Sequence, residues 1–162
     1  MNMLVKLTNV IVQKALIIMM AMIVATVTWQ VFSRFILASP SSFTEELSRF
    51  LLIWIGMLGA AYAYYTRAHL GLDLFVNKLH TSNKRITIII IELMVLIFAL
   101  TILVFGGLSL VLMTLELKQT SAALEVQVGL VYLVVPSSGV LISMYCTNNL
   151  LNIINVNAQE HS

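Results

Sequence analysis

Hydrophobic residues along this chain gather into four long stretches separated by short polar breaks. The stretches cover residues 10–37, 50–65, 86–115 and 126–146. A helix needs about 20 apolar residues to cross the hydrocarbon core of a bilayer, and each stretch approaches or exceeds that length. The pattern therefore predicts an all-α integral membrane protein with four transmembrane helices, built as a single membrane domain over residues 1–162.

Two further segments, 40–49 and 70–80, mix apolar and charged positions. In the first, Phe43, Leu47 and Phe50 fall on one helical face, and the second has a similar apolar stripe. Both patterns predict short amphipathic helices that lie at the membrane surface.

Two positions inside the long stretches favour distortion of a helix. Gly106–Gly107 is the expected bend in the third stretch, which is too long for an upright crossing. Pro136 removes one backbone hydrogen bond from the fourth, so a kink is expected there.

The distribution of Lys and Arg predicts the orientation. Six of them lie at the N-terminal end and in the loop after the second stretch, and three lie on the opposite side. Cytoplasmic loops are enriched in positive residues, so both termini are expected in the cytoplasm. Residues 38–49 and 116–125 then face outward.

Composition supports the membrane assignment, because 60% of the 162 residues are hydrophobic and 10% are charged. The net charge of +2 and the lack of a basic run give no indication of nucleic-acid binding. A single cysteine, Cys146, excludes an intrachain disulfide and a zinc-type cysteine cluster.

The sequence offers little catalytic chemistry. It contains no phosphate-binding glycine loop, no nucleophile elbow and no H-E-x-x-H motif. His69 and Asp73 are spaced i,i+4, but a metal site needs more ligands, so we interpret them as structural residues of the cytoplasmic loop. The chain is therefore not expected to be an enzyme, and no cofactor is expected in it.

Small residues in the second stretch form a stripe at helical spacing, namely Gly56, Gly59, Ala60 and Ala63. Such stripes let another helix approach closely in a membrane. Two interpretations remain open: the stripe packs on the protein's own helices, or it packs on another subunit. The nearby Trp54 is assigned to the same subunit contact.

Charged residues near the outer ends of the first two stretches have structural or partner-binding interpretations. Ser42 and Glu45 match a capping box, and Glu45 and Arg49 are spaced to form an ion pair. Capping alone does not account for Glu46 as well. We therefore assign Arg34, Glu45, Glu46 and Arg49 to structural or partner contacts on the outer side, which the family resemblance described below would make the periplasmic side.

Two further charges, Lys14 and Glu92, lie inside apolar stretches. Because intramembrane charges are costly, one hypothesis is that they pair at similar depth. The alternative is that Lys14 extends to the interface and Glu92 reaches headgroup water.

Several motifs occur in a characteristic order. Arg34-Phe35 is followed by Glu45-Glu46-x-x-Arg49 with Trp54, then by Gly59-Ala60-Ala61, and finally by Arg67-Ala68-His69-x-x-x-Asp73. In this order and in its four spans, the chain resembles the small membrane subunit, of the DctQ type, of tripartite ATP-independent periplasmic (TRAP) transporters.

That resemblance implies a multi-pass subunit of the bacterial inner membrane. It implies a large multi-span partner subunit that carries substrate and sodium, and a periplasmic substrate-binding protein. The chain would then be a non-catalytic scaffold for uptake of an organic anion, with sialic acid the favoured substrate. It also implies membrane lipids as partners, including a bound phospholipid.

Rival functions remain to be separated. An assembly subunit of an unrelated membrane complex would share the small-residue stripe and would not co-isolate with a large carrier. A lipid-acting enzyme would depend on His69 and Asp73, and a stand-alone carrier would transport solute when reconstituted alone.

Overall fold

The computed structural model describes residues 3–37, 39, 41–66 and 81–160. Within these ranges every regular element is a helix, and strand-like pairing is limited to one bridge between Thr120 and Gln127. The elements are α1 (Met3–Phe35), α2 (Ser42–Tyr65), α4 (Thr81–Phe98), the π-helical segment η1 (Ala99–Gly106), α5 (Gly107–Glu116), α6 (Val128–Tyr132) and α7 (Val134–Glu160). The predicted all-α class is confirmed.

Helices long and apolar enough to cross a membrane number four among the described residues. They are Val5–Phe35, Ser42–Tyr65, Ile86–Glu116 and Val128–Ile153. The predicted number of spans is confirmed. The last span is longer than predicted, because the helix continues past Cys146 through a polar, asparagine-rich region.

Helix α2 begins earlier than the sequence pattern predicted. It runs without interruption from Ser42, so residues 42–49 are its first turns and do not form a separate surface helix. No glycine or proline occurs between Ser41 and Ile55 to end a helix, whereas the charged residues there are all compatible with one. The other predicted surface segment, 70–80, lies outside the described residues.

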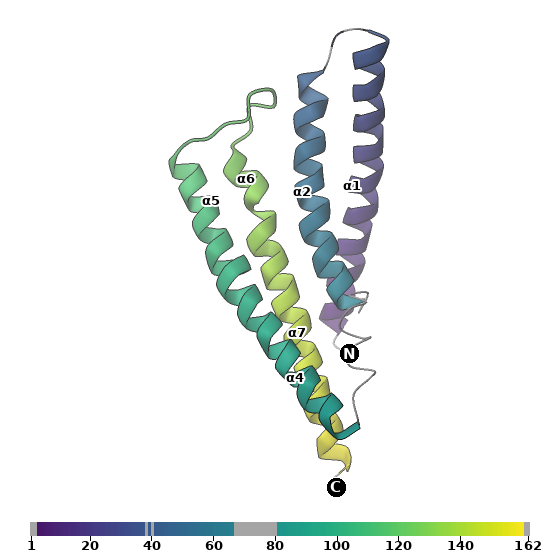
Figure 1. The fold of residues 1–162 in the computed structure, drawn as a ribbon, viewed down its shortest axis with the longest axis vertical. Helices are drawn as coiled ribbons and strands as arrows, with labels where there is room; N and C mark the ends of the chain where they lie inside the picture. Colours follow the sequence, from purple (N-terminus) through teal and green to yellow (C-terminus); the bar gives the residue numbers. More distant parts are fainter. Residues whose placement is uncertain (1–2, 38, 40, 67–80, 161–162) are drawn as a thin grey trace.

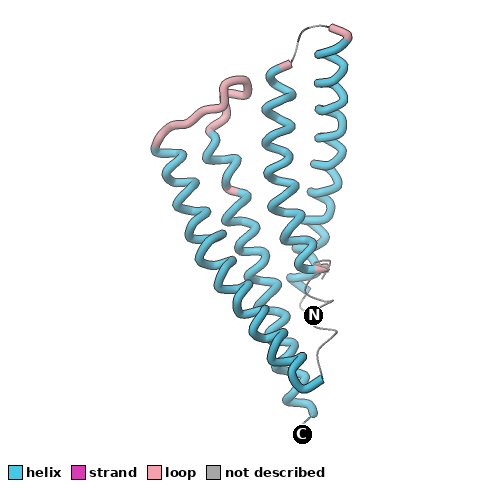
Figure 2. Tube along the Cα trace, in the orientation of Figure 1, coloured by secondary structure: helices cyan, strands magenta, loops and turns pink. Residues whose placement is uncertain are grey.

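The helices are arranged as two antiparallel pairs (Figure 1). α1 and α2 form one pair, and the continuous rod of α4, η1 and α5 lies beside α6 and α7 in the other. Contacts between α2 and α7 join the pairs. Figure 2 shows the end of α1, the start of α2 and the 117–127 loop at one end of the bundle, which we call the loop end. Both termini lie toward the opposite end, which we call the terminal end.

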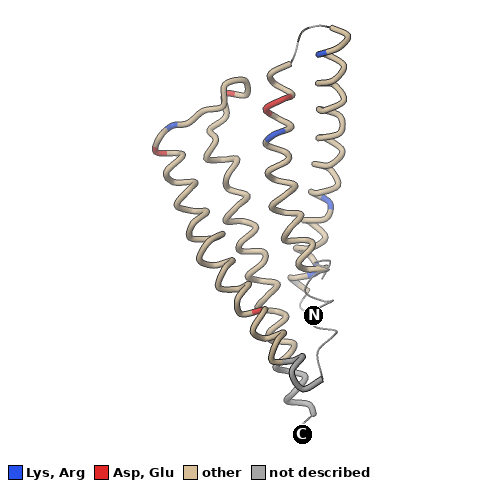
Figure 3. The backbone as a smooth tube through the Cα atoms, viewed as in Figure 1, with Lys and Arg blue, Asp and Glu red and all other residues tan. Residues whose placement is uncertain are grey.

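The central core is small and lies where three helices meet. Val12 of α1, Leu58 of α2 and Val134 of α7 are buried together. The chain itself buries 39% of the apolar window of the last span but 6% of the first. α7 is therefore the central helix, and most of α1 is left for lipid or another protein to cover. Figure 3 shows the long uncharged lengths of the rods.

One of the two expected helix distortions occurs beside Pro136, as predicted, and the other occurs before Gly106 instead of at it. The proline ring at Pro136 conflicts with the carbonyl four residues earlier, and the helix is interrupted at Leu133, between α6 and α7. Gly106 and Gly107 instead have regular helical angles, φ −63° and ψ −42°. The third span changes geometry in the preceding turns, as the π-helical segment η1.

The 117–127 loop begins with a tight reversal. The amide of Gln119 donates to the Thr114 carbonyl at 3.3 Å, and that of Lys118 donates to Leu115 at 3.0 Å. This is a Schellman ending, with Lys118 in the left-handed region at φ 48° where glycine is usual. Two more bonds, from Ser121 to Val126 and from Val128 to Gln119, fold the loop back on itself.

Candidate functional site

Helix α2 has two different faces. Its buried side, which packs on α1 and α7, includes Thr44, Ser48, Leu51, Leu58 and Ala61. The opposite side is exposed along its length and comprises Glu45, Arg49, Leu52, Gly56 and Ala60. Because the members of each set are three, four or seven residues apart, each set forms one stripe of the helix. We call the exposed stripe, together with the half-buried Gly59 and Ala63 at its border, the open face of α2.

The glycines of the open face have free space around them. A Cβ atom built at Gly56 or at Gly59 would meet nothing within 4 Å. The sequence left open whether this stripe packs on the protein's own helices, and for these two glycines it does not. A helix of a partner protein can therefore approach α2 closely at these two glycines.

Trp54 does not belong to the open face. It is half-buried and packs against the core formed by Val12, Leu58 and Val134. The side chain therefore contributes to the packing of this chain, and its assignment to a contact with another subunit stays a prediction.

The first turns of α2 confirm one predicted contact and correct another. Arg49 donates to the Glu45 carboxylate at 3.1 Å, as their spacing predicts, and both side chains are more than half exposed. The predicted capping box does not form. Ser41, not Ser42, is the N-cap, it makes no side-chain cap bond, and Glu45 is engaged with Arg49.

Glu46, one residue further, points into the chain instead of outward. Its carboxylate accepts the Ser121 hydroxyl and the backbone amides of Ala122, Ala123 and Leu124, the amide bonds being 2.8 to 3.1 Å long. One carboxylate thus satisfies four donors of a single turn. It fastens the 117–127 loop to α2 and joins the two helix pairs at the loop end. Arg34, by contrast, is exposed near the end of α1.

Glu92 is the second internal anchor, within the spans toward the terminal end. It is 8% exposed, accepts the Tyr64 hydroxyl, and accepts the Asn149 amide at 3.0 Å. The Cys146 sulfur lies 2.9 Å from the Tyr64 oxygen. The Tyr64 hydroxyl donates its one proton to Glu92, so in this arrangement the Cys146 thiol is the donor to the Tyr64 oxygen. Three helices, α2, α4 and α7, meet at this carboxylate.

The predicted pair of Lys14 and Glu92 is wrong. Lys14 is exposed, and within the described residues the only ion pair is Arg49 with Glu45. Glu92 instead finds neutral donors on two neighbouring helices. A membrane-buried carboxylate is satisfied by such bonds without a cation.

His69 and Asp73 lie outside the described residues, so their structural role stays a prediction. Across residues 3–66 and 81–160, apart from positions 38 and 40, no three His, Cys, Asp or Glu side chains gather as a metal site would require.

The partners of the two anchors were not found from the sequence. The sequence pattern gave no indication that Tyr64, Ser121 or Asn149 donates to a carboxylate. Their contacts with Glu46 and Glu92 span 28 to 75 residues of sequence. The one available signal was that Glu92 is a carboxylate in an otherwise apolar stretch.

Comparison with known proteins agrees with this architecture. The family model for the DctQ component of tripartite ATP-independent periplasmic transporters matches residues 22–155. A putative TRAP transporter small permease protein of Haemophilus influenzae is 31% identical over 147 residues, covering 88% of this chain and 89% of that protein.

Two further relatives match over shorter lengths. The sialic acid TRAP transporter small permease protein SiaQ of Vibrio cholerae is 31% identical over 65% of this chain, and the chain spans 61% of its length. The isethionate TRAP transporter permease protein DctMQ of Oleidesulfovibrio alaskensis is 35% identical over 62% of this chain, which spans 16% of that longer polypeptide. With four spans and a family match over most of its length, this chain is a multi-pass membrane protein that belongs to the DctQ component family of TRAP transporters.

Proposed function

We propose that this chain is the non-catalytic small membrane subunit of a TRAP secondary transporter and acts as a scaffold for a large permease subunit. The observation that carries the proposal is the open face of α2, where a Cβ atom added at Gly56 or Gly59 would have no atom of another described helix within 4 Å. The DctMQ relative supports it, because a segment similar to this chain there forms part of a much longer permease polypeptide.

The scaffold role follows from how the chain is held together. Glu46 fixes the two helix pairs at the loop end and Glu92 fixes them within the spans toward the terminal end. Between these anchors α2 is held as one straight element, and its open face keeps a constant position. A rigid surface of this kind suits a subunit against which a moving domain works.

The proposed location is the bacterial inner membrane, with both termini in the cytoplasm. The even number of spans and the two termini at one end of the bundle support this topology (Figure 1). The loop end, with Arg34, Glu45, Arg49 and the 117–127 loop, then faces the periplasm. There we place contact with a periplasmic substrate-binding protein.

The proposed substrate is a small organic anion, taken up with sodium through the large subunit. The relatives are named for sialic acid and for isethionate, which are both acidic solutes. Sialic acid stays our first candidate for this chain's transporter, and in this proposal the large subunit supplies the substrate and sodium sites.

Co-purification and reconstitution test the function. The tagged chain, isolated in mild detergent from its native membrane, is expected to retain a large multi-span permease. Liposomes that contain both subunits, with the periplasmic protein and a sodium gradient, should accumulate labelled sialic acid. Uptake by liposomes that contain this chain alone, or isolation of the chain with an unrelated complex, would contradict the proposal.

A further inference from the structure

Glu92 lies where α2, α4 and α7 meet, and the hydrogen-bond donors described for it are neutral. Its carboxylate accepts the Tyr64 hydroxyl and, at 3.0 Å, the Asn149 amide. The Cys146 sulfur lies 2.9 Å from the Tyr64 oxygen, and either of these two atoms could be the donor. Cys146, Tyr64 and Glu92 therefore form a short chain of hydrogen bonds that ends at a titratable carboxylate.

No cation is paired with this carboxylate in the part of the chain that the structure describes. The only ion pair found there joins Arg49 to Glu45 at the loop end. Helix α7 has no charged residue before Glu160, and the nearest charged positions on α4 itself are Lys84 and Arg85, at least seven residues away. The charge of the carboxylate is therefore balanced by hydrogen bonds alone.

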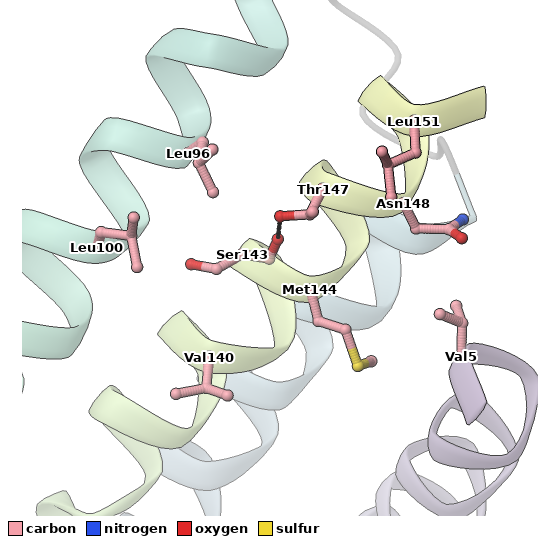
Figure 4. A pocket seen from close by; sticks show the side chains of 9 residues that line it. All are labelled: Val5, Leu96, Leu100, Val140, Ser143, Met144, Thr147, Asn148 and Leu151. Carbon is pink, nitrogen blue, oxygen red and sulfur yellow. Dashed lines mark hydrogen bonds between the residues drawn. The ribbon is translucent and has the colours of Figure 1, made fainter. Parts of the chain in front are cut away.

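The neighbouring polar groups of α7 have other surroundings. Tyr145 packs against Tyr65 of α2, with the ring centroids 5.0 Å apart. Thr147 and Asn148 line a groove on the outer side of α7 (Figure 4), and the Thr147 hydroxyl donates to a carbonyl of its own helix at 2.8 Å. The hydrogen-bonded chain thus contains the titratable groups that face the carboxylate from α2 and from α7.

The depth of Glu92 gives a proton access to it. It lies six residues after the start of the span Ile86–Glu116, or about 9 Å along the helix axis. This span of 31 residues is about 46 Å long, so when centred and upright it extends about 8 Å beyond each side of a hydrocarbon core of about 30 Å. Glu92 is therefore close to the edge of the hydrocarbon, and with 8% of its surface exposed it can exchange a proton with headgroup water.

The hydrogen-bonded chain can satisfy the carboxylate with or without a proton. When Glu92 is ionised, the thiol donates to Tyr64 and Tyr64 donates to the carboxylate. When Glu92 takes up a proton from water, its new O–H can donate to the Tyr64 oxygen, and the Tyr64 O–H can turn to the Cys146 sulfur, which also accepts. Tyr64 and Cys146 keep their own protons and only rotate these bonds. Neither state leaves a hydroxyl proton buried without an acceptor, which would be costly.

We propose that Glu92 is a reversible proton-binding site within the membrane, and that Tyr64 and Cys146 are positioning residues that adapt to its two states. Binding of the proton reverses two hydrogen bonds and leaves the heavy atoms in place. The three helices therefore stay joined in both states, and the position of α2 does not depend on whether the proton is bound.

Infrared difference spectroscopy of the full-length chain in mild detergent tests the site. The C=O stretch of a protonated carboxyl group reports the bound proton, and the part of this band that Glu92→Gln abolishes belongs to Glu92. It should titrate reversibly between about pH 4 and about pH 10. Tyr64→Phe removes a donor to the ionised form, so it should raise the midpoint by about one pH unit, a tenfold tighter binding of the proton. Absence of a Glu92 band over this range would overturn the proton site.

Cys146 should give the opposite shift. Cys146→Ala leaves the Tyr64 proton without an acceptor only when Glu92 is protonated, so the midpoint should fall by about half a pH unit, or about threefold weaker binding of the proton. Cys146→Ser keeps a donor and an acceptor and should titrate close to wild type. Thr147→Ala, at the exposed next residue, is the matched control and should leave the midpoint unchanged.

The direction of these shifts decides the role of the two positioning residues. An unchanged midpoint in Cys146→Ala, or shifts of the same sign in Cys146→Ala and Tyr64→Phe, would overturn the reversal of the hydrogen bonds. If Cys146→Ala does not fold, Tyr64→Phe decides alone, and a midpoint at or below that of wild type would overturn the proposal.

Discussion

Glycines serve opposite purposes on two helices of this protein. On α6 and α7 they bring backbones together: a Cβ atom at Gly129 would lie 2.7 Å from Leu115 Cγ, and one at Gly139 would lie 2.7 Å from Leu103 Cβ. On α2, a Cβ atom at Gly56 or Gly59 would meet nothing within 4 Å among the described residues. The same residue type thus marks the internal helix contact in one place and an uncovered surface in the other. The difference separates residues that hold the chain together from residues available to a partner.

The largest expected effect on stability is at the internal contact. Gly139→Ala should destabilise the chain by about 1 to 3 kcal/mol, because the new methyl group meets Leu103 and the rods must separate. Gly56→Ala is the matched control and should be neutral or stabilising by up to about 1 kcal/mol, since alanine favours a helix. Thermal unfolding in detergent measures both. Equal destabilisation by the two substitutions would contradict the distinction between glycines at internal contacts and glycines on the open face.

The next effect concerns the intramembrane anchor. Glu92→Ala should cost about 1 to 3 kcal/mol, because the Tyr64 hydroxyl and the Asn149 amide lose their acceptor in a buried place. Glu92→Gln retains an acceptor and should recover much of the loss. Unfolding of the Glu92→Ala, Lys14→Ala double variant tests the pair directly. We expect its change in unfolding free energy to equal the sum of the two single changes, whereas a clear departure from that sum would indicate that Lys14 and Glu92 interact.

A smaller effect is expected at the loop end. Glu46→Ala should free the turn at residues 121–124, because three backbone amides lose their acceptor. Hydrogen exchange at Ala123 and Leu124 should become faster, while exchange in α7 stays unchanged. Glu46→Gln, which keeps one carbonyl oxygen, should give an intermediate rate. Unchanged exchange in Glu46→Ala would show that the loop holds itself in place.

The smallest effect on the chain is expected at the exposed ion pair. Arg49→Ala should change stability by at most about 0.5 kcal/mol, because exposed i,i+4 pairs contribute little. The same thermal unfolding assay measures it. A loss as large as that of Glu92→Ala would mean that the open face stabilises the isolated chain, contrary to its exposure.

Periodicity and composition were sufficient to predict much of the fold. The four spans follow from runs of apolar residues, and the break before Pro136 follows from a ring that cannot continue the hydrogen-bond ladder. The start of α2 was misjudged because Glu45, Glu46 and Arg49 look like interfacial residues. The residues around Glu46 do not reveal that its carboxylate accepts hydrogen bonds from the distant turn at residues 121–124. Those bonds are what allow a charged residue to belong to a span.

The site was predictable only where its contacts are local. The Glu45–Arg49 pair follows from i,i+4 spacing, and the small-residue stripe follows from helical periodicity. Which face of α2 is buried depends on where α1 and α7 pack, and Glu92 meets Tyr64 and Asn149 only after three helices have assembled. Lys14 and Glu92 were matched by charge and estimated depth, and neither property specifies which helices are neighbours.

The most direct test of the partner-facing role of α2 is a substitution that fills its open face without disturbing the chain. In a Gly56→Leu, Gly59→Leu double variant, the new Cβ atoms have no described atom within 4 Å, so we expect the isolated chain to fold as wild type. Co-purification with the large permease subunit should fall at least about tenfold, because two helices could no longer approach closely. Ala21→Leu, at an exposed small residue of α1, is the control and should co-purify normally. Wild-type recovery of the large subunit by the folded double variant would contradict the account.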